Sequence, residues 1–217
     1  MTAQQSFLIR YPSASLLLIQ LLGIVFYPFL EDRAHGRAIM GAFGIVVLAA
    51  ALRMVRRSPL IQWVAFTLAG CILGLTIIDD LHGEPLVSLS LALLEAAFYF
   101  YAAASLIAYM MEDQRATTDE LFAVGATFTL LAWAFAYSFD VCQMLIPGSF
   151  TAAIDPDEPR SWVELLFLSF SILSGVGIGD ILPLSPMARA LVMLEQFAGV
   201  MYIALVVSRL IALTIRR

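Results

Sequence analysis

The stretch SGVGIGD, residues Ser174–Asp180, places glycines at every second position between an apolar segment and an aspartate. Three kinds of element are rich in glycine: a nucleotide-binding loop, a packing seam between helices, and a row of backbone carbonyls that binds ions. A dinucleotide loop has the spacing G-x-G-x-x-G and lies between a strand and a helix, whereas this stretch reads G-x-G-x-G in apolar surroundings. A packing seam has small residues at every fourth position, and glycines at every second position would break a helix. The stretch therefore favours the row of carbonyls.

The composition of the chain places this stretch in a membrane. Of the 217 residues, 61% are hydrophobic and 13% are charged, whereas a soluble globular domain is about half apolar and about a quarter charged. We therefore expect an integral membrane protein whose partners include membrane lipid but no nucleic acid. Cys71 and Cys142 lack the spacing of metal ligands or of a redox pair. They are expected to be small buried apolar groups, and no cofactor is expected.

Six apolar runs meet or approach the length of about 20 residues that crosses a bilayer. They cover residues 12–30, 38–54, 60–78, 86–111, 119–145 and 187–213. Arginine and lysine gather on the cytoplasmic side of membrane proteins. Six crossings put Arg10, the cluster RMVRRSP at 52–58 and the final pair Arg216 and Arg217 on one side. The pattern predicts a multi-pass protein of a bacterial-type plasma membrane with both termini in the cytoplasm.

A shorter apolar segment lies between the fifth and sixth runs. A polar loop at 147–160 leads into SWVELLFLSFSIL at 161–173, which is too short to span and is expected to be a re-entrant helix. The glycines that follow it allow backbone conformations closed to other residues. Non-helical backbone at membrane depth occurs only where it is buried in protein or lines a water-filled path. A row of carbonyls that replaces the hydration shell of an ion meets this condition.

These residues carry a family resemblance. The segment FLSFSILSGVGIGDILPLSP at 167–186 resembles the pore helix, selectivity filter and outer turn of the potassium channel superfamily, whose usual filter reads T-V-G-Y-G-D. The segment that follows, ARALVMLEQFAGVMYIALVVSRLIAL at 188–213, resembles the inner helix of bacterial members. The resemblance implies an all-α membrane protein of six transmembrane helices, with a re-entrant pore helix and filter between spans five and six. One filter strand cannot enclose an ion, so four chains are expected to form a homotetrameric pore.

The resemblance also implies two domains and a set of site residues. Residues 1–115 would form a four-span domain with the layout of a voltage sensor, and residues 116–217 would form the pore domain. Gly199 would be the hinge of the inner helix, and Asp180 would lie at the outer mouth of the filter. The residues implied to bind K+ through their carbonyls are Gly175, Val176, Gly177, Ile178 and Gly179, those implied to support the filter are Ser171, Ser174 and Glu195, and those expected to line the cavity and gate are Val200, Ile203, Val207 and Ile211.

Two of these assignments have alternatives. The stripe that begins at Val200 recurs at i+3 and i+4 on a helix, and it either lines the cavity or packs on other helices. Glu195 either makes a structural hydrogen bond to Ser169 or Ser171, or tunes gating by protonation. Glu95, in the fourth span, is expected to pair with a polar group on a neighbouring span that the sequence does not identify.

Three residues depart from the usual filter pattern. Gly175 stands where the family has a threonine hydroxyl, and Ile178 stands where it has a tyrosine or phenylalanine ring. Phe167 stands where some members have a tryptophan that holds the filter aspartate, and a phenylalanine ring cannot donate a hydrogen bond. The hypothesis is a looser filter that selects weakly for potassium or collapses easily into a non-conducting form. The alternative is that packing by Ile178 suffices and selectivity for potassium survives.

The fourth run, 86–111, contains no arginine, whereas a voltage sensor carries several in one span. The function expected is therefore a passive potassium channel without voltage sensing, in which K+ ions pass in single file, and not an enzyme. A weakly selective cation channel and a non-conducting membrane protein that retains the pore architecture are the alternatives.

Overall fold

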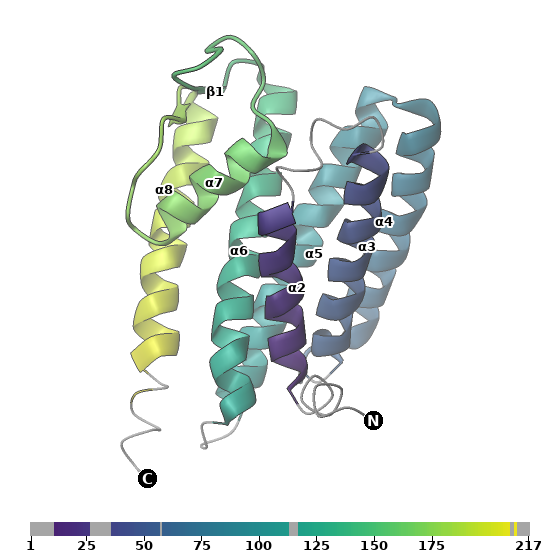
Figure 1. The fold of residues 1–217 in the computed structure, drawn as a ribbon, viewed down its shortest axis with the longest axis vertical. Helices are drawn as coiled ribbons and strands as arrows, with labels where there is room; N and C mark the ends of the chain where they lie inside the picture. Colours follow the sequence, from purple (N-terminus) through teal and green to yellow (C-terminus); the bar gives the residue numbers. More distant parts are fainter. Residues whose placement is uncertain (1–10, 27–35, 57, 113–116, 209–210, 212–217) are drawn as a thin grey trace.

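The computed structural model describes residues 11–26, 36–56, 58–112, 117–208 and 211. These residues form a bundle of long helices, with a shorter helix and a two-stranded sheet at one end (Figure 1). The helices are α2 (Pro12–Phe26), α3 (Gly36–Val55), α4 (Gln62–His82), α5 (Pro85–Met111), α6 (Thr118–Leu145), α7 (Trp162–Leu173), α8 (Pro186–Tyr202) and the π-helical segment η2 (Ile203–Val207), and the strands are β1 (Phe150–Thr151) and β2 (Leu182–Pro183).

Four helices in the described part of the chain are long and apolar enough to cross a membrane. They are Gln62–His82, Pro85–Met111, Thr118–Leu145 and the combined stretch Pro186–Val206. The shorter apolar helical stretches are Pro12–Phe26, Trp162–Leu173 and the part Gly44–Val55 of α3. Residues 27–30 of the first predicted span and residue 10 with the C-terminal arginines lie outside the described residues. The count of six spans and the placement of the termini stay predictions.

The helix ends follow from local sequence signals. Proline begins α5 and α8, and proline is tolerated at a first helical position because the N–H that it lacks would be unpaired there. The Ser185 hydroxyl accepts the Ala188 N–H and so caps α8. Gly83 ends α4 with a φ of 61°, a conformation that glycine adopts without steric cost.

Helix α6 is the centre of the bundle. It packs against α2, α5, α7 and α8, and most of its inward face is alanine, threonine or an aromatic residue. Tyr99 on α5 stacks on Tyr137 with ring centroids 5.6 Å apart and meets the edge of Trp133 at 5.4 Å. Trp133 in turn meets Trp162 at the start of α7, at 5.2 Å. This aromatic column joins α5, α6 and the start of α7.

Polar contacts between buried side chains tie the first helix to α6. Both oxygens of Asp119 accept hydrogen bonds from Ser13, one from its N–H at 3.1 Å and one from its hydroxyl at 2.8 Å. Farther along, the Thr129 hydroxyl donates to Gln20 Oε1 at 2.6 Å. The predicted boundary between domains at 115/116 falls at residues outside the described part, so the division into two domains stays a prediction.

Glu95 has a partner on the neighbouring helix. Its side chain hydrogen-bonds with Tyr137 of α6. The sequence indicated that Glu95 would pair with a polar group on another helix, and the structure identifies that group.

Candidate functional site

Helix α7 comes directly before the glycine-rich stretch in the chain and positions it. Its N-terminus carries a capping box, in which the Ser161 hydroxyl accepts the Glu164 N–H and a Glu164 carboxylate oxygen accepts the Ser161 N–H. Such a reciprocal pair satisfies two otherwise unpaired donors and fixes the start of a helix. The helix lies obliquely across the end of the bundle (Figure 1) and packs on α6 and α8. It begins and ends within one residue of the segment 161–173 predicted from the sequence.

The segment Ser174–Asp180 leaves α7 without forming a helix or strand. Gly175 and Gly177 have φ angles of 73° and 67°, in the left-handed region that residues with a Cβ rarely enter. A threonine at 175 would be strained in this conformation, which gives a local reason for glycine there. The side chains of Val176 and Ile178 are 62% and 68% exposed.

Hydrogen bonds at Gly175, Gly177 and Ile178 hold the segment against the last turn of α7. Gly175 N–H donates to Ile172 O at 3.0 Å, and Gly177 N–H donates to Ser171 O at 3.0 Å. The Ser171 hydroxyl donates to the carbonyl of Ile178. Of the residues predicted to support the filter, Ser171 therefore contacts the segment directly, while the Ser174 hydroxyl donates to Ser171 O at 3.2 Å.

A small antiparallel sheet holds the part of the chain that follows the segment. Strand β2 pairs antiparallel with β1, with Phe150 opposite Pro183 and Thr151 opposite Leu182. Ser149, which is fully buried, accepts the Leu184 N–H at its carbonyl at 2.8 Å. Strands of two residues carry no periodic pattern, so the sequence did not predict this pairing.

Phe167 lies beside the outer part of the segment. A Cβ built on Gly179 would come within 3.5 Å of Cε1 of its ring. The ring has no donor, so it cannot bind the Asp180 carboxylate as a tryptophan would. The β1–β2 pair, which begins two residues after Asp180, is the observed anchor of this end of the segment.

Glu195 is fully buried on α8 and meets α7 at Ser169. The Ser169 hydroxyl hydrogen-bonds with Glu195 Oε1 and with Ala132 O of α6, the latter at 2.8 Å. Ser169, and not Ser171, is thus the serine that contacts Glu195. The contact joins α6, α7 and α8 behind the glycine-rich segment.

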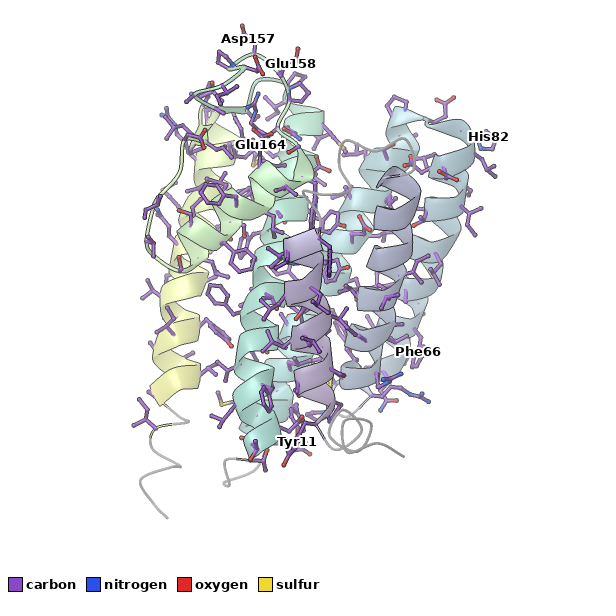
Figure 2. All side chains as sticks on the ribbon, viewed as in Figure 1. Tyr11, Phe66, His82, Asp157, Glu158 and Glu164 are labelled. Atoms are coloured by element: carbon purple, nitrogen blue, oxygen red, sulfur yellow. The ribbon has the colours of Figure 1, made fainter. Side chains whose placement is uncertain are left out.

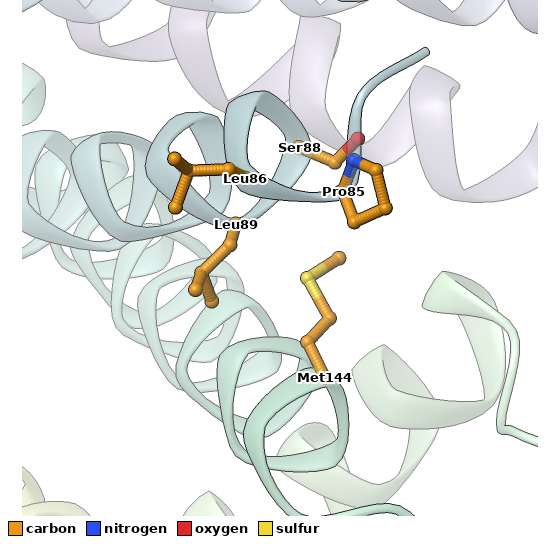
Figure 3. Close-up of a pocket in the computed structure, with 5 residues that line it drawn as sticks. All are labelled: Pro85, Leu86, Ser88, Leu89 and Met144. Atoms are coloured by element: carbon orange, nitrogen blue, oxygen red, sulfur yellow. The ribbon is translucent and has the colours of Figure 1, made fainter.

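An open apolar groove of about 480 Å³ lies elsewhere, between the start of α5 and the end of α6 (Figure 3). Pro85, Leu86, Ser88, Leu89 and Met144 line it. It shares no residue with the glycine-rich segment or its supports and does not belong to this site.

Comparison with known protein families identifies the family of this chain. A family model described as ion channel matches residues 96–216, more than half of the chain. The chain belongs to the ion channel family. The match confirms the resemblance to the potassium channel superfamily, and the family is one of transport proteins and not of enzymes. No curated protein and no solved structure matches the chain significantly.

The channel's Gly199 packs against α7. A Cβ at this position would lie 2.2 Å from the carbonyl oxygen of Leu173 and 2.9 Å from its carbonyl carbon. Real side chains do not approach backbone so closely, so only glycine allows α8 to contact the end of α7 here. The sequence assigned Gly199 to a hinge; that role stays a prediction, while the close packing is observed.

The predicted cavity stripe of the channel crosses a change in helix type. Val200 is in α8, and Ile203 and Val207 are the ends of the π-helical segment η2. A π-helix has i→i+5 hydrogen bonds, so α-helical spacing does not predict which side chains share a face across it. Val200, Ile203 and Ile211 are exposed, and the side chain of Val207 lies outside the described residues. Their roles at the cavity and gate stay predictions.

A buried arginine with several hydrogen bonds lies near the site of the channel and was not predicted from the sequence. Arg160, at the end of the loop before α7, is only 5% exposed. All five of its N–H donors have acceptors: the carbonyls of Ile154, Asp155 and Glu158 and the carboxylate of Glu164. Asp157 and Glu158 lie at the tip of the loop, above Glu164 (Figure 2). The signal available in the sequence was an arginine four residues before the glutamate of a capping box.

Glu195 yields a test of how α6, α7 and α8 are joined in the channel. The Ser169 hydroxyl has one proton but two neighbouring acceptors, Ala132 O and Glu195 Oε1. In a Glu195→Gln variant the amide N–H would donate to the Ser169 oxygen, and the Ser169 proton would go to Ala132 O. We expect this variant to unfold within about 1 kcal/mol of wild type. Glu195→Ala removes the contact and leaves a cavity, and we expect it to lose about 2–4 kcal/mol. Thermal unfolding in detergent micelles measures both. Equal losses in the two variants would show instead that the carboxylate itself is required.

Proposed function

We propose that the protein is a homotetrameric potassium channel that conducts passively and senses no voltage. In this proposal the chain crosses the membrane six times, α7 is the pore helix, Ser174–Asp180 is the selectivity filter, α6 is the outer helix and α8 is the inner helix. The observation that carries it is the short apolar helix α7, which leads into an exposed non-helical glycine segment between two membrane-capable helices. Irregular backbone of this kind at membrane depth has to line a water-filled path or be buried in protein.

The tetramer follows from the geometry of ion binding. One segment offers carbonyls on one side of an ion only, and a dehydrated ion needs them all around. Several apolar side chains around the segment are also exposed in a single chain. Exposed apolar residues there and on α8 are Phe167, Val176, Ile178, Met193, Leu194 and Phe197. Neighbouring copies packed around a central axis would bury this surface.

The channel works without a voltage sensor in this proposal because α5 carries no arginine. Charges that move through the membrane field are what make opening steeply dependent on voltage. The ions bind at the carbonyls of residues 175–179, with Asp180 at the outer mouth, and the inner helices open or close the cytoplasmic end. The distribution of arginine supports a plasma membrane of bacterial type with both termini in the cytoplasm.

Flux into liposomes tests the proposal. Purified wild-type protein is expected to carry K+ and to give a reversal potential that follows the potassium equilibrium potential in opposed K+ and Na+ gradients. Gly177→Val is expected to abolish the flux, because Gly177 has a φ of 67° that a β-branched residue does not adopt. Gly74→Ala, on α4 with no atom near the added methyl group, is the matched control. Absence of flux under all ion, lipid and pH conditions would contradict the proposal.

A weakly selective cation channel is the second candidate. The observation that favours it is the exposure of Ile178, whose side chain provides neither a ring nor a hydroxyl to brace the segment. A reversal potential midway between those of potassium and sodium would favour this candidate over the selective one.

A further inference from the structure

Ser171 makes two hydrogen bonds to the glycine-rich segment. Its carbonyl accepts the Gly177 N–H at 3.0 Å, and its hydroxyl donates to the carbonyl of Ile178. The next serine along the helix, Ser174, makes no such contact and donates to Ser171 O instead. Ser171 is thus the residue of α7 that engages a carbonyl of the segment with its side chain.

This hydrogen bond turns the Ile178 carbonyl toward α7. In the proposed channel α7 lies behind the filter, on the side away from the axis, so a carbonyl directed at α7 is not directed at an ion. The side chain of Ile178 is 68% exposed and does not pack on α7 in its place. The Ile178 carbonyl thus lies on the side of α7, and the Ile178 side chain lies on the exposed side. A carbonyl that binds an ion on the axis would need the opposite arrangement.

Few steric restraints act on the peptide that carries this carbonyl. Ile178 has a glycine on each side. A methyl group on Gly177 would meet no atom within 4 Å, and one on Gly179 would meet only Phe167 Cε1 at 3.5 Å and Ile181 N at 4.0 Å, which are ordinary contact distances. The exposed Ile178 side chain also offers little packing to resist a turn. The Ser171 hydrogen bond is therefore the main observed restraint on the direction of this carbonyl.

We propose that the Ser171 hydroxyl and the permeant cation compete for the Ile178 carbonyl. When the hydroxyl holds the oxygen, the filter lacks one ring of ligands; when a cation takes it, the ring is complete. Ser171 then sets the K+ concentration at which the filter conducts. This inference rests on the proposed function and assigns Ser171 a positioning role within it.

Removal of the hydroxyl tests the competition. One neutral hydrogen bond changes an equilibrium constant by about twofold to tenfold. We therefore expect Ser171→Ala to lower the K+ concentration for half-maximal liposome flux by about threefold or more. Ser171→Thr keeps the hydroxyl and should stay close to wild type. Ser90→Ala is the matched control, because Ser90 donates only to Leu86 O of its own helix.

The outcomes separate this inference from the proposed function. Flux in all variants with an unchanged half-maximal K+ concentration, or a higher one in Ser171→Ala, overturns the competition and leaves the channel intact. No flux in wild type or any variant, and no ion density on the axis, contradicts the proposed function itself. A purely structural role of Ser171 would change the amount of folded tetramer but not the K+ dependence of its flux.

A second measurement does not depend on a folded alanine variant. Structures of the wild-type tetramer at low and high K+ are expected to show the Ile178 carbonyl on Ser171 in the first and on a bound ion in the second. A carbonyl that stays on Ser171 at a K+ concentration giving full flux would overturn the inference. Ser171→Cys, with a weaker donor of similar size, is expected to shift the half-maximal concentration in the same direction as alanine.

Discussion

Gly199→Ala is expected to lose the folded protein and, with it, all ion flux. The added methyl group would lie 2.2 Å from the carbonyl oxygen of Leu173 and 2.9 Å from its carbonyl carbon. Both are backbone atoms at the end of α7, so relief requires α7 and α8 to move apart. Overpacking typically costs about 1–3 kcal/mol and sometimes more, and here no flexible side chain can absorb it. We therefore expect a loss of about 3 kcal/mol or more in thermal unfolding.

The control for this prediction is Gly74→Ala in α4. No atom lies within 4 Å of its added methyl group, and alanine is better than glycine in a helix by about 1 kcal/mol. This variant should be as stable as wild type or slightly more stable. If Gly199→Ala instead folds normally and only opens less often, Gly199 is a hinge and not a packing glycine.

The order and approximate limits of the helices were predictable because their signals are local. The predicted runs 86–111 and 119–145 differ from α5 and α6 by one residue at the N-terminus, since both runs are predominantly apolar and polar residues or proline bound them. The short helix at 161–173 was also predictable, because its run is too short to span and Ser161 with Glu164 marks its start. The glycine spacing likewise predicted a non-helical segment after α7.

The contacts behind that segment were not predictable because their acceptors are backbone carbonyls. Any residue supplies such a group, so the sequence holds no sign that Gly199 faces Leu173 O or that Ser171 reaches Ile178 O. The choice between Ser169 and Ser171 as the partner of Glu195 depends on how α7 is rotated. The π-helical turn at Ile203–Val207 also lacks a sequence signal here, since the apolar run continues through it.

Arg160→Ala is expected to remove the hydrogen bonds that hold the loop before α7 and so to reduce both stability and ion flux. The guanidinium is buried and satisfies three backbone carbonyls as well as the carboxylate of Glu164, to which NH1 lies at 3.2 Å. Its backbone is held too, because Arg160 N–H donates to Gln143 Oε1 at 3.0 Å and Gln143 Nε2 donates to Arg160 O at 2.8 Å. The Glu164 side chain is 38% exposed, so the loss comes mainly from the backbone carbonyls that lose a charged donor. Hydrogen bonds to charged groups contribute about 1.5–3 kcal/mol each, and we expect the variant to lose about 3 kcal/mol.

Lysine cannot replace this arginine. Its ammonium carries three donors on one nitrogen, whereas the planar guanidinium carries five donors that spread over separate acceptors. Arg160→Lys should therefore recover only part of the stability and flux. Arg189→Ala is the matched control, because Arg189 is exposed and donates from Nε to Pro183 O alone. Thermal unfolding and liposome flux measure all three variants. Equal behaviour of Arg160→Ala and Arg189→Ala would mean that the loop is held by β1 and β2 without Arg160, whereas a large loss at Arg160 only would make the loop part of the support of α7.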